Sequence, residues 1–283
     1  MIRRLALTAL VVPLLGACAT AEADLSPAQA GDTLHLPAAH LPGGIYTRLC
    51  APPPGAPPGR LVVINHGSPP DPAVRPAMRP ASCQSEAVRW FTARGHLVAI
   101  PMRRGYGQTG GAWAEGYGNC NAPDYARAGR ETARDILATV RAMQARPGTP
   151  AGPAIVVGQS AGGWGALALA SAEPLEVGRV INMAGGRGGR NNDLPNNVCR
   201  PERLVSATSA LGLTARMPTL WIYAANDSFF GPALARDMAA AWRLAGAPVA
   251  FRPMPAFGRD GHGLFFGQGG SAIWGSEVEA FLR

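Results

Sequence analysis

Short apolar runs alternate with helix-like segments along most of the chain, and this alternation restricts the possible folds more than any other feature. Buried strands are expected at residues 61–64, 97–100, 155–157, 180–181 and 220–223, with a weaker sixth at 249–251. Continuous apolar runs of this length are typical of parallel strands that are covered on both faces. Helices are expected at residues 84–94, 124–146, 161–171, 232–244 and 273–282. The pattern predicts an α/β protein with a mostly parallel twisted sheet and helices on both faces.

Composition supports a folded domain and excludes several kinds of chemistry. Hydrophobic residues make up 47% of the 283 residues, which is enough for a sizeable core and excludes a disordered chain. All 26 basic residues are arginine, so the chain has no lysine for a P-loop, a Schiff base or a Ser–Lys dyad. The net charge is +8, but the arginines are dispersed and form no basic stripe. We therefore expect no nucleic-acid partner.

The N-terminus has the features of an export signal. Arg3 and Arg4 precede an apolar stretch at residues 5–15, which is too short to span a bilayer. The following Leu-Gly-Ala-Cys, ending at Cys18, resembles the lipobox of bacterial lipoproteins. That resemblance implies a signal peptide at residues 1–17, lipidation of Cys18, a tether at 18–39 and a periplasmic or outer-membrane-anchored location. The alternative is an ordinary cleaved signal peptide in which Cys18 is incidental.

The remaining cysteines also fit an exported protein. They are four in number, which allows three disulfide pairings in an oxidising compartment: Cys50, Cys83, Cys120 and Cys199. Sequence alone does not choose among the pairings, and we favour Cys83–Cys120 with Cys50–Cys199. A metal site is not expected, because no two cysteines are spaced as C-x-x-C and no histidine lies close by. No cofactor is implied.

A Gly-x-Ser-x-Gly motif indicates a nucleophile. Ser160 lies in it between an apolar strand and a small-residue helix, which is where a serine nucleophile occupies a strained turn. Gly158 and Gly162 leave room for the strand and helix to cross closely. The start of the helix would direct free N–H groups at a developing oxyanion. The alternative is a Gly-rich turn with an ordinary capping serine.

A serine hydroxyl needs a base and an orienting carboxylate to become reactive. His262 remains after elimination, because the other four histidines precede the core, open a buried strand or belong to the loop after the first buried strand. Asp227 directly follows the strand at 220–223. The chain order Ser160, Asp227, His262 is the order in which a serine, an acid and a histidine form a catalytic triad in this kind of fold. Asp260 is the rival acid, although its place two residues before His262 favours a loop-shaping role.

The loop after the first buried strand reads His66-Gly67-Ser68. In a parallel α/β sheet that carries a serine nucleophile after a strand, this loop supplies a second backbone N–H donor to the oxyanion. We assign that donor to the amide of Ser68, with Gly67 as the alternative, alongside the amide of Ala161. His66 is expected to order the loop rather than to act as a base.

Together these motifs resemble the α/β-hydrolase superfamily over nearly all of residues 40–283, and in particular its dienelactone-hydrolase and prolyl-oligopeptidase-like branches. Residues 102–111 are also similar to the D-x-R-G-x-G-x-S-x-G segment of X-prolyl dipeptidyl peptidases, but Met102 replaces the Asp and Thr109 the Ser. Ser160 departs from dienelactone hydrolases, which carry Cys at the nucleophile position. The resemblance implies a serine hydrolase that acts on a small carboxylic ester. The alternatives are a serine peptidase acting on short peptides and a non-catalytic lipoprotein that keeps the fold as a binding module.

Two segments could contact substrate. Arg104 and Tyr106 lie in a Gly-rich loop after the second buried strand, where such loops border a binding crevice; a purely structural loop fits the residues equally well. Residues 184–218 form the main insertion and are expected to make a short lid. Arg187 and Arg190 in this insertion could bind an anionic group, but solvated surface arginines are the simpler interpretation. The sequence indicates no oligomeric state.

Overall fold

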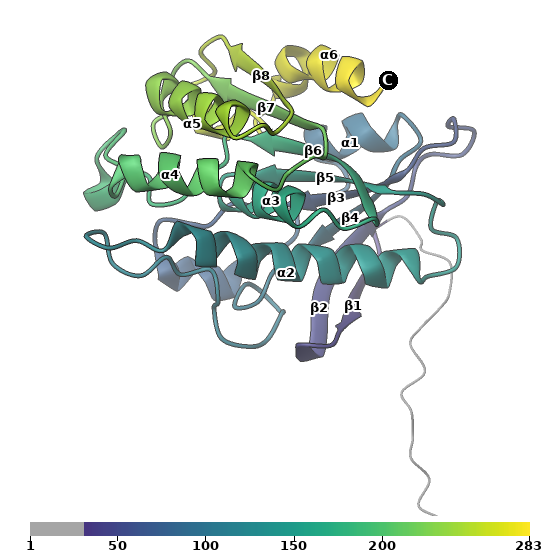
Figure 1. Ribbon diagram of the computed structural model, residues 1–283. Coiled ribbons are helices and arrows are strands. Elements are labelled where there is room, and N and C mark those ends of the chain that lie inside the picture. The colour runs from purple at the N-terminus through teal and green to yellow at the C-terminus, as the bar shows by residue number, and fades with distance from the viewer. Residues whose placement is uncertain (1–30) are drawn as a thin grey trace, which may run out of the picture.

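The structure is a computed structural model that describes residues 31–283 (Figure 1). The predicted signal peptide at 1–17 and the predicted lipidation site Cys18 lie outside the described residues. Within the described range an eight-stranded sheet has the order β1-β2-β4-β3-β5-β6-β7-β8. Strand β2 pairs antiparallel with β1 and with β4, and the other strand pairs are parallel. The predicted fold class, a mostly parallel α/β sheet, is confirmed.

The six predicted strands are all present, and their burial explains why they could be predicted. They are β3 (Leu61–Asn65), β4 (Leu97–Pro101), β5 (Ala154–Gln159), β6 (Val177–Met183), β7 (Thr219–Ala224) and β8 (Val249–Met254). Every residue of β3, β4 and β7 is buried, because helices cover both faces of the sheet. The edge strand β8 is only partly buried, which accounts for its weaker apolar signal.

Helices lie on both faces of the sheet, as Figure 1 shows. One face carries α1 (Glu86–Thr92) and α6 (Gly270–Leu282), and the other carries α2 (Tyr125–Gln144), α3 (Ala161–Ala172), α4 (Pro201–Gly212) and α5 (Pro232–Leu244). Each layer of helices closes a hydrophobic core against the sheet. The longest helix, α2, begins where the side chain of Asp124 accepts a 2.8 Å hydrogen bond from the amide of Arg127.

Three elements differ from the sequence-based expectation. Strands β1 (Thr33–Ala38) and β2 (Leu41–Cys50) precede the first predicted strand, so the folded domain begins within the predicted tether at 18–39. Helix α4 lies within residues 184–218, which were predicted as a lid. It packs against α5 and buries Leu204 and Leu211, so the second half of this insertion belongs to the core rather than to a cover.

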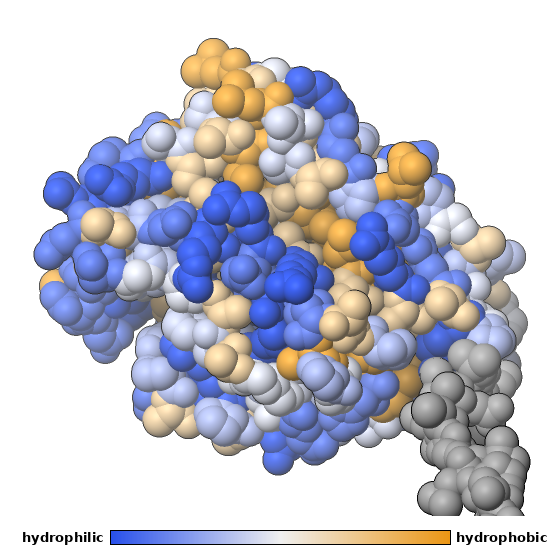
Figure 2. Space-filling model, turned by 60° about the horizontal axis from the view of Figure 1, so that its bottom comes forward, coloured by the Kyte–Doolittle hydropathy of each residue, from blue (hydrophilic) through white to orange (hydrophobic). Residues whose placement is uncertain are grey.

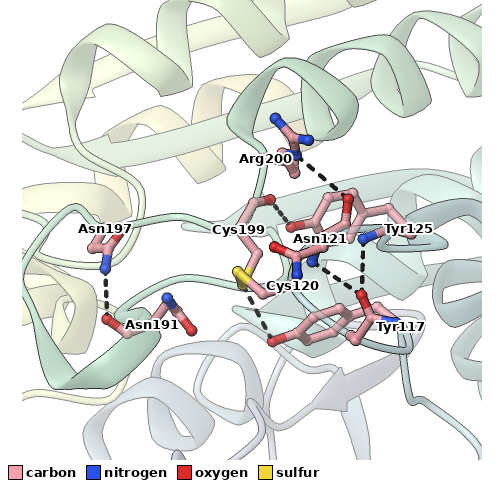
Figure 3. The surroundings of a disulfide bond; sticks show 10 residues. Tyr117, Cys120, Asn121, Tyr125, Asn191, Asn197, Cys199 and Arg200 are labelled. Atoms are coloured by element: carbon pink, nitrogen blue, oxygen red, sulfur yellow. Dashed lines mark hydrogen bonds between the residues drawn. A yellow bond between two sulfur atoms is a disulfide. The ribbon is translucent and has the colours of Figure 1, made fainter.

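All four remaining cysteines form disulfides, but the favoured pairing was wrong. The bonds join Cys50 to Cys83 and Cys120 to Cys199, with Cα atoms 5.5 and 4.8 Å apart. Cys50 ends β2 and Cys83 precedes α1, so the first bond joins neighbours on one face of the sheet. The second bond joins the loop before α2 to the segment before α4 (Figure 3). These neighbours are set by the packing of helices, which the order of cysteines along the chain does not reveal.

The surface of the described residues is largely polar, and Figure 2 shows small apolar patches scattered between polar side chains on one face. No helix within residues 31–283 is long and apolar enough to cross a membrane.

Candidate active site

A cavity of about 240 Å³ opens at the carboxyl ends of the central strands. It lies beside β3 and β5, which are neighbours in the sheet although β4 separates them in sequence. Open α/β sheets bind ligands where the strand order reverses in this way. The cavity is lined by the loop after β3, the loop between β4 and α2, the start of α3 and the loops after β6 and β7: Ser68, Pro69, Pro70, Arg75, Trp113, Gly116, Tyr117, Gly118, Ser160, Ala161, Gly186, Arg187, Gly188, Gly189, Phe229 and Phe230.

Ser160 lies on this cavity in a strained conformation. Its φ of 55° and ψ of −119° are unfavourable for a residue with a side chain, and such strain is characteristic of functional sites. The turn is possible because its flanking glycines have no Cβ. A Cβ at Gly158 would overlap the carbonyl oxygen of Gly162, and one at Gly162 would lie 2.6 Å from the carbonyl oxygen of His66. The backbones of β5, of the turn at Ser160 and of the loop after β3 are therefore in direct contact.

Ser68 and Ala161, the two predicted oxyanion donors, line the same cavity as Ser160. The loop of Ser68 is held close to the serine, because a Cβ at Gly67 would lie only 3.0 Å from Cβ of Ser160. Ala161 is the first residue of α3, so its amide belongs to the turn of the helix whose N–H groups have no acceptor within the helix. The two residues thus border one cavity, Ser68 from the loop after β3 and Ala161 from the start of α3.

His262 and Asp227 form a buried pair. The ring nitrogen Nδ1 of His262 lies 3.1 Å from each carboxylate oxygen of Asp227, and the two residues are 8% and 1% exposed. The amides of Phe229 and Phe230 donate to Oδ1 of Asp227 at 2.8 and 2.9 Å, which fixes the carboxylate. Because a carboxylate only accepts hydrogen bonds, Nδ1 carries the proton and Nε2 keeps a free lone pair.

Asp260, the rival acid, contacts backbone instead of the imidazole. Its side chain accepts from the amides of His262 and Ser228, each at 3.0 Å, and from the Ser228 hydroxyl at 2.5 Å. Burial raises the pKa of Asp260, but these hydrogen bonds outweigh it and hold the pKa below its usual range. Asp260 therefore shapes the loop that carries His262.

Within residues 31–283 no hydrogen bond joins Ser160 to His262, and His262 is not among the residues that line the cavity; the two are linked through residues beside them. The side chain of Gln159, the residue before the serine, donates to the carbonyl oxygen of His262 at 3.1 Å. The ring of Phe229 stacks on the imidazole with centroids 4.1 Å apart, and Phe230 approaches it edge-on at 5.7 Å. Both rings also line the cavity that holds Ser160. Hydrogen bonds between a nucleophile and its base are often long in structures without substrate.

A second buried cluster borders the cavity, and sequence reasoning did not find it. The guanidinium of Arg103 forms an ion pair with Glu115, and both side chains are almost fully buried. Burial alone raises the pKa of Glu115, but the charges of Arg103 and Arg187 lower it to about 2. The hydroxyl of Tyr106 lies 3.0 Å from the Glu115 carboxylate and 2.9 Å from the Ser68 hydroxyl. This cluster therefore ties the Ser68 loop to the Gly-rich loop after β4.

His66 belongs to the same cluster and orders its loop. Nδ1 lies 2.7 Å from the carbonyl oxygen of Gly67, and Nε2 accepts from the amide of Arg103 at 3.3 Å. Both ring nitrogens are therefore occupied in the neutral form. Burial, and then the charge of Arg103, lower the pKa of His66 to about 3.

Arg104 and Tyr106 are not among the residues that line the cavity, which favours the alternative of a structural loop over substrate contact. Arg104 forms ion pairs with Glu131 and Asp135, at 2.7 and 2.8 Å. Tyr106 is fully buried and acts within the Glu115 cluster.

Of the two arginines of the insertion, Arg187 differs from the surface interpretation and Arg190 fits it. Arg187 is 5% exposed and lines the cavity, whereas Arg190 pairs with Asp193 at 2.7 Å near the surface. The Cys120–Cys199 disulfide links the loop before α2 to the segment between β6 and α4, and residues of both segments line the cavity (Figure 3).

No group of three or more His, Cys, Asp or Glu side chains within residues 31–283 is arranged to hold a metal ion. Glu115 and Arg75 were not predicted as site residues, because Glu115 lies in a loop and Arg75 in a single short 3-10 helix, and neither segment has a periodic pattern. The one available signal was that Glu115 lies between Trp113 and Tyr117 in a Gly-rich stretch.

A scan against protein-family models and a search of curated proteins found no match. Solved structures do match. An esterase from Pyrococcus furiosus is similar with a TM-score of 0.59 at 15% identity, covering 92% of this chain and 91% of its own. A serine hydrolase without a lid from Xanthomonas campestris is similar with a TM-score of 0.53 at 17% identity, covering 87% and 95%. Dipeptidyl peptidase 4 of Porphyromonas gingivalis is similar with a TM-score of 0.62 at 13% identity, covering 89% of this chain but 35% of its own. The chain therefore has the α/β-hydrolase fold, which it shares with serine esterases at low identity.

Proposed function

We propose that this protein is a serine hydrolase that cleaves carboxylic esters, with Ser160, His262 and Asp227 as its catalytic triad. The observation that carries the proposal is the His262–Asp227 hydrogen-bonded pair. It is supported by the strained turn of Ser160 on the cavity and by the hydrogen bond from Gln159, the residue before Ser160, to the carbonyl oxygen of His262. The likeness of the fold to esterases adds support.

In the proposed reaction Oγ of Ser160 attacks the ester carbonyl carbon while Nε2 of His262 takes the hydroxyl proton. The tetrahedral intermediate collapses, and the alcohol leaves with that proton. Water then attacks the acyl-serine, again losing a proton to His262, and the carboxylic acid is released as Ser160 recovers its proton. Asp227 keeps the imidazole oriented and stabilises its positive charge throughout.

The amides of Ala161 and Ser68 are proposed to stabilise the oxyanion of each tetrahedral intermediate. Preorganised donors of this kind are worth about 10²–10³ in rate each. The Glu115 cluster supports the Ser68 loop through the Tyr106–Ser68 contact, so the loop need not reorganise during the reaction.

The proposed location is outside the cytoplasm. Two disulfides fit an oxidising compartment. Anchoring through a lipid on Cys18 remains part of the proposal and rests on the sequence of the N-terminal segment.

A fluorophosphonate probe tests the nucleophile. The wild type and a Ser171→Ala control, which alters a serine at the other end of α3, should be labelled, and Ser160→Ala should not. p-Nitrophenyl esters of increasing chain length, assayed beside aminoacyl-arylamides, then separate an esterase from a peptidase. A wild type that neither reacts with the probe nor cleaves any of these substrates would support a non-catalytic binding module.

A further inference from the structure

Two arginines that the proposed triad does not use share the cavity with Ser160. Arg187 comes from the loop after β6, and Arg75 comes from the short 3-10 helix Pro72–Ala77 after β3. Trp113 lies between them: the guanidinium of Arg75 is 3.5 Å from a ring centroid of Trp113, and that of Arg187 is 5.7 Å away. Two positive groups from distant loops thus meet on one aromatic side chain beside the nucleophile.

The hydrogen-bonding capacity of both guanidinium groups is only partly used. The Nε atoms of Arg75 and Arg187 are buried and have no hydrogen-bond partner within residues 31–283. Arg187 binds the backbone and carboxylate of Glu115 through Nη2 alone. A buried donor without an acceptor is costly. Because both side chains line the cavity, an acceptor that enters it can bind the guanidinium groups that the described residues leave incompletely paired.

Positive charges also outnumber negative ones on the side of the cavity that Arg75 and Arg187 line. Arg103 and Arg187 both pair with one carboxylate, Glu115, and Arg103 makes the closer contact with it. Partial burial, together with the repulsion of Arg187, lowers the pKa of Arg75 despite the opposing influence of Glu115 and Asp71. A bound anion would reduce this repulsion and supply acceptors for both guanidinium groups.

We propose that Arg75 and Arg187 form an anion subsite that selects esters bearing a carboxylate on the acyl part, such as half-esters of short dicarboxylic acids. Phe229 and Phe230 line the same cavity and provide apolar contacts for the carbon chain between the ester and the carboxylate. A cavity of about 240 Å³ fits a short acyl chain. This inference rests on the proposed ester hydrolysis at Ser160 and adds a preference to it.

A matched pair of substrates measures the preference. Monomethyl glutarate and methyl pentanoate have the same five-carbon acyl chain and differ in the terminal carboxylate. We expect kcat/KM to be about tenfold or more higher for the half-ester, which is the scale of a hydrogen bond to a charged group. Arg75→Met should reduce that ratio to about threefold or less. Arg79→Met removes the same charge from the same segment but from an exposed side chain that contacts only backbone carbonyls, so its ratio should match the wild type.

Equal kcat/KM for the two esters in the wild type, or a ratio unchanged in Arg75→Met, would overturn the anion subsite while leaving ester hydrolysis intact. Arg75→Met is the informative variant because Arg75 is half-buried, whereas Arg187 is buried against Glu115 and its replacement could prevent folding.

Calorimetry on Ser160→Ala tests the subsite without hydrolysis. Glutarate should bind to Ser160→Ala, and its Kd should rise at least about tenfold when Arg75→Met is added. Inorganic phosphate is the second ligand. Tighter binding of phosphate than of glutarate would contradict a carboxylate subsite, as would the absence of glutarate binding. If no ester is cleaved yet glutarate binds through Arg75, the subsite stands and the proposed hydrolysis falls.

Discussion

Two histidines, the partly buried His66 after β3 and the buried His262 after β8, have partners that suit them to different roles. The ring of His262 faces the carboxylate of Asp227, which can stabilise a positive charge on it. The ring of His66 lies beside Arg103, where burial and the positive charge lower its pKa to about 3. Both nitrogens of His66 are engaged with backbone, whereas Nε2 of His262 has no hydrogen-bond partner within residues 31–283. The different partners of the two rings therefore fit a structural role for His66 and the proposed role of proton carrier for His262.

The largest effect expected from this comparison is on turnover. His262→Gln removes the proposed base, and kcat should fall by about 10⁴-fold or more, as measured with a p-nitrophenyl ester. His66→Gln keeps an amide that can donate and accept in the same loop, so it should cost about tenfold at most. Comparable losses in the two variants would erase the distinction between them.

The two aspartates near His262 should differ in the same way as the two histidines: Asp227 is needed for turnover and Asp260 is not. Asp227→Asn should fold normally yet lose about 10⁴-fold in kcat, because the amide favours the wrong imidazole tautomer. Asp260→Asn can still accept from the amides of Ser228 and His262, so a loss of about tenfold at most is expected. Near-UV circular dichroism serves as the folding control for both. Full turnover by Asp227→Asn would remove this carboxylate from the mechanism.

The structural histidine should be visible in the pH dependence of stability. The pKa of His66 is about 3 in the folded protein and about 6.5 in the unfolded chain. Between these values the unfolded chain takes up a proton that the folded protein does not, so stability falls as the pH drops from about 6.5 towards 3. The slope contributed by His66 is up to about 1.4 kcal/mol per pH unit.

Urea unfolding between pH 6 and pH 5 measures this slope, in a range above the ordinary pKa of glutamate. His66→Gln should lose stability less steeply than the wild type, by close to one proton. The lowered pKa of Glu115, about 2 in the folded protein against an ordinary 4.5, adds a further loss only below about pH 4.5. Equal slopes for the wild type and His66→Gln above pH 5 would show that His66 is not held neutral.

The smallest expected effect concerns the packing of the His262 ring. Phe229 stacks on the imidazole at 4.1 Å, so Phe229→Leu should reduce kcat/KM by about three- to tenfold through looser positioning. Phe281→Leu, on the far helix α6, is the control and should leave the rate unaltered. If Phe229→Leu is as active as the control, the stacking does not position the base.

The central strands and the proposed triad could be predicted because each has a local signal. Fully buried strands such as Leu61–Asn65 are apolar at almost every position, and Ser160 is framed by glycines that its turn requires. Strands β1 and β2 lie at the edge of the sheet and mix exposed with buried positions, so their sequence resembles a loop. That weaker pattern explains why β1 was assigned to the tether and why β2 was not predicted as a strand.

The position of Arg187 and the disulfide pairing could not be predicted, because they depend on contacts between residues that are far apart in the sequence. Arg187 reaches the carbonyl of Glu115 across 72 positions, and nothing near Arg187 distinguishes it from a surface arginine. The disulfide from Cys120 to Cys199 spans 79 positions and is set by how α2 and α4 pack. Spacing in the sequence carries no record of such neighbours.

The central claim is that His262 and Asp227 make Ser160 reactive enough to take an acyl group, and trapping that group tests it most directly. The wild type is mixed with p-nitrophenyl acetate, quenched in acid within milliseconds to seconds, and digested for peptide mass mapping. We predict one acetyl group on the hydroxyl of Ser160, formed in a burst with p-nitrophenol and absent from Ser160→Ala. Turnover that leaves this serine unmodified, or that continues undiminished in Ser160→Ala, would contradict the account.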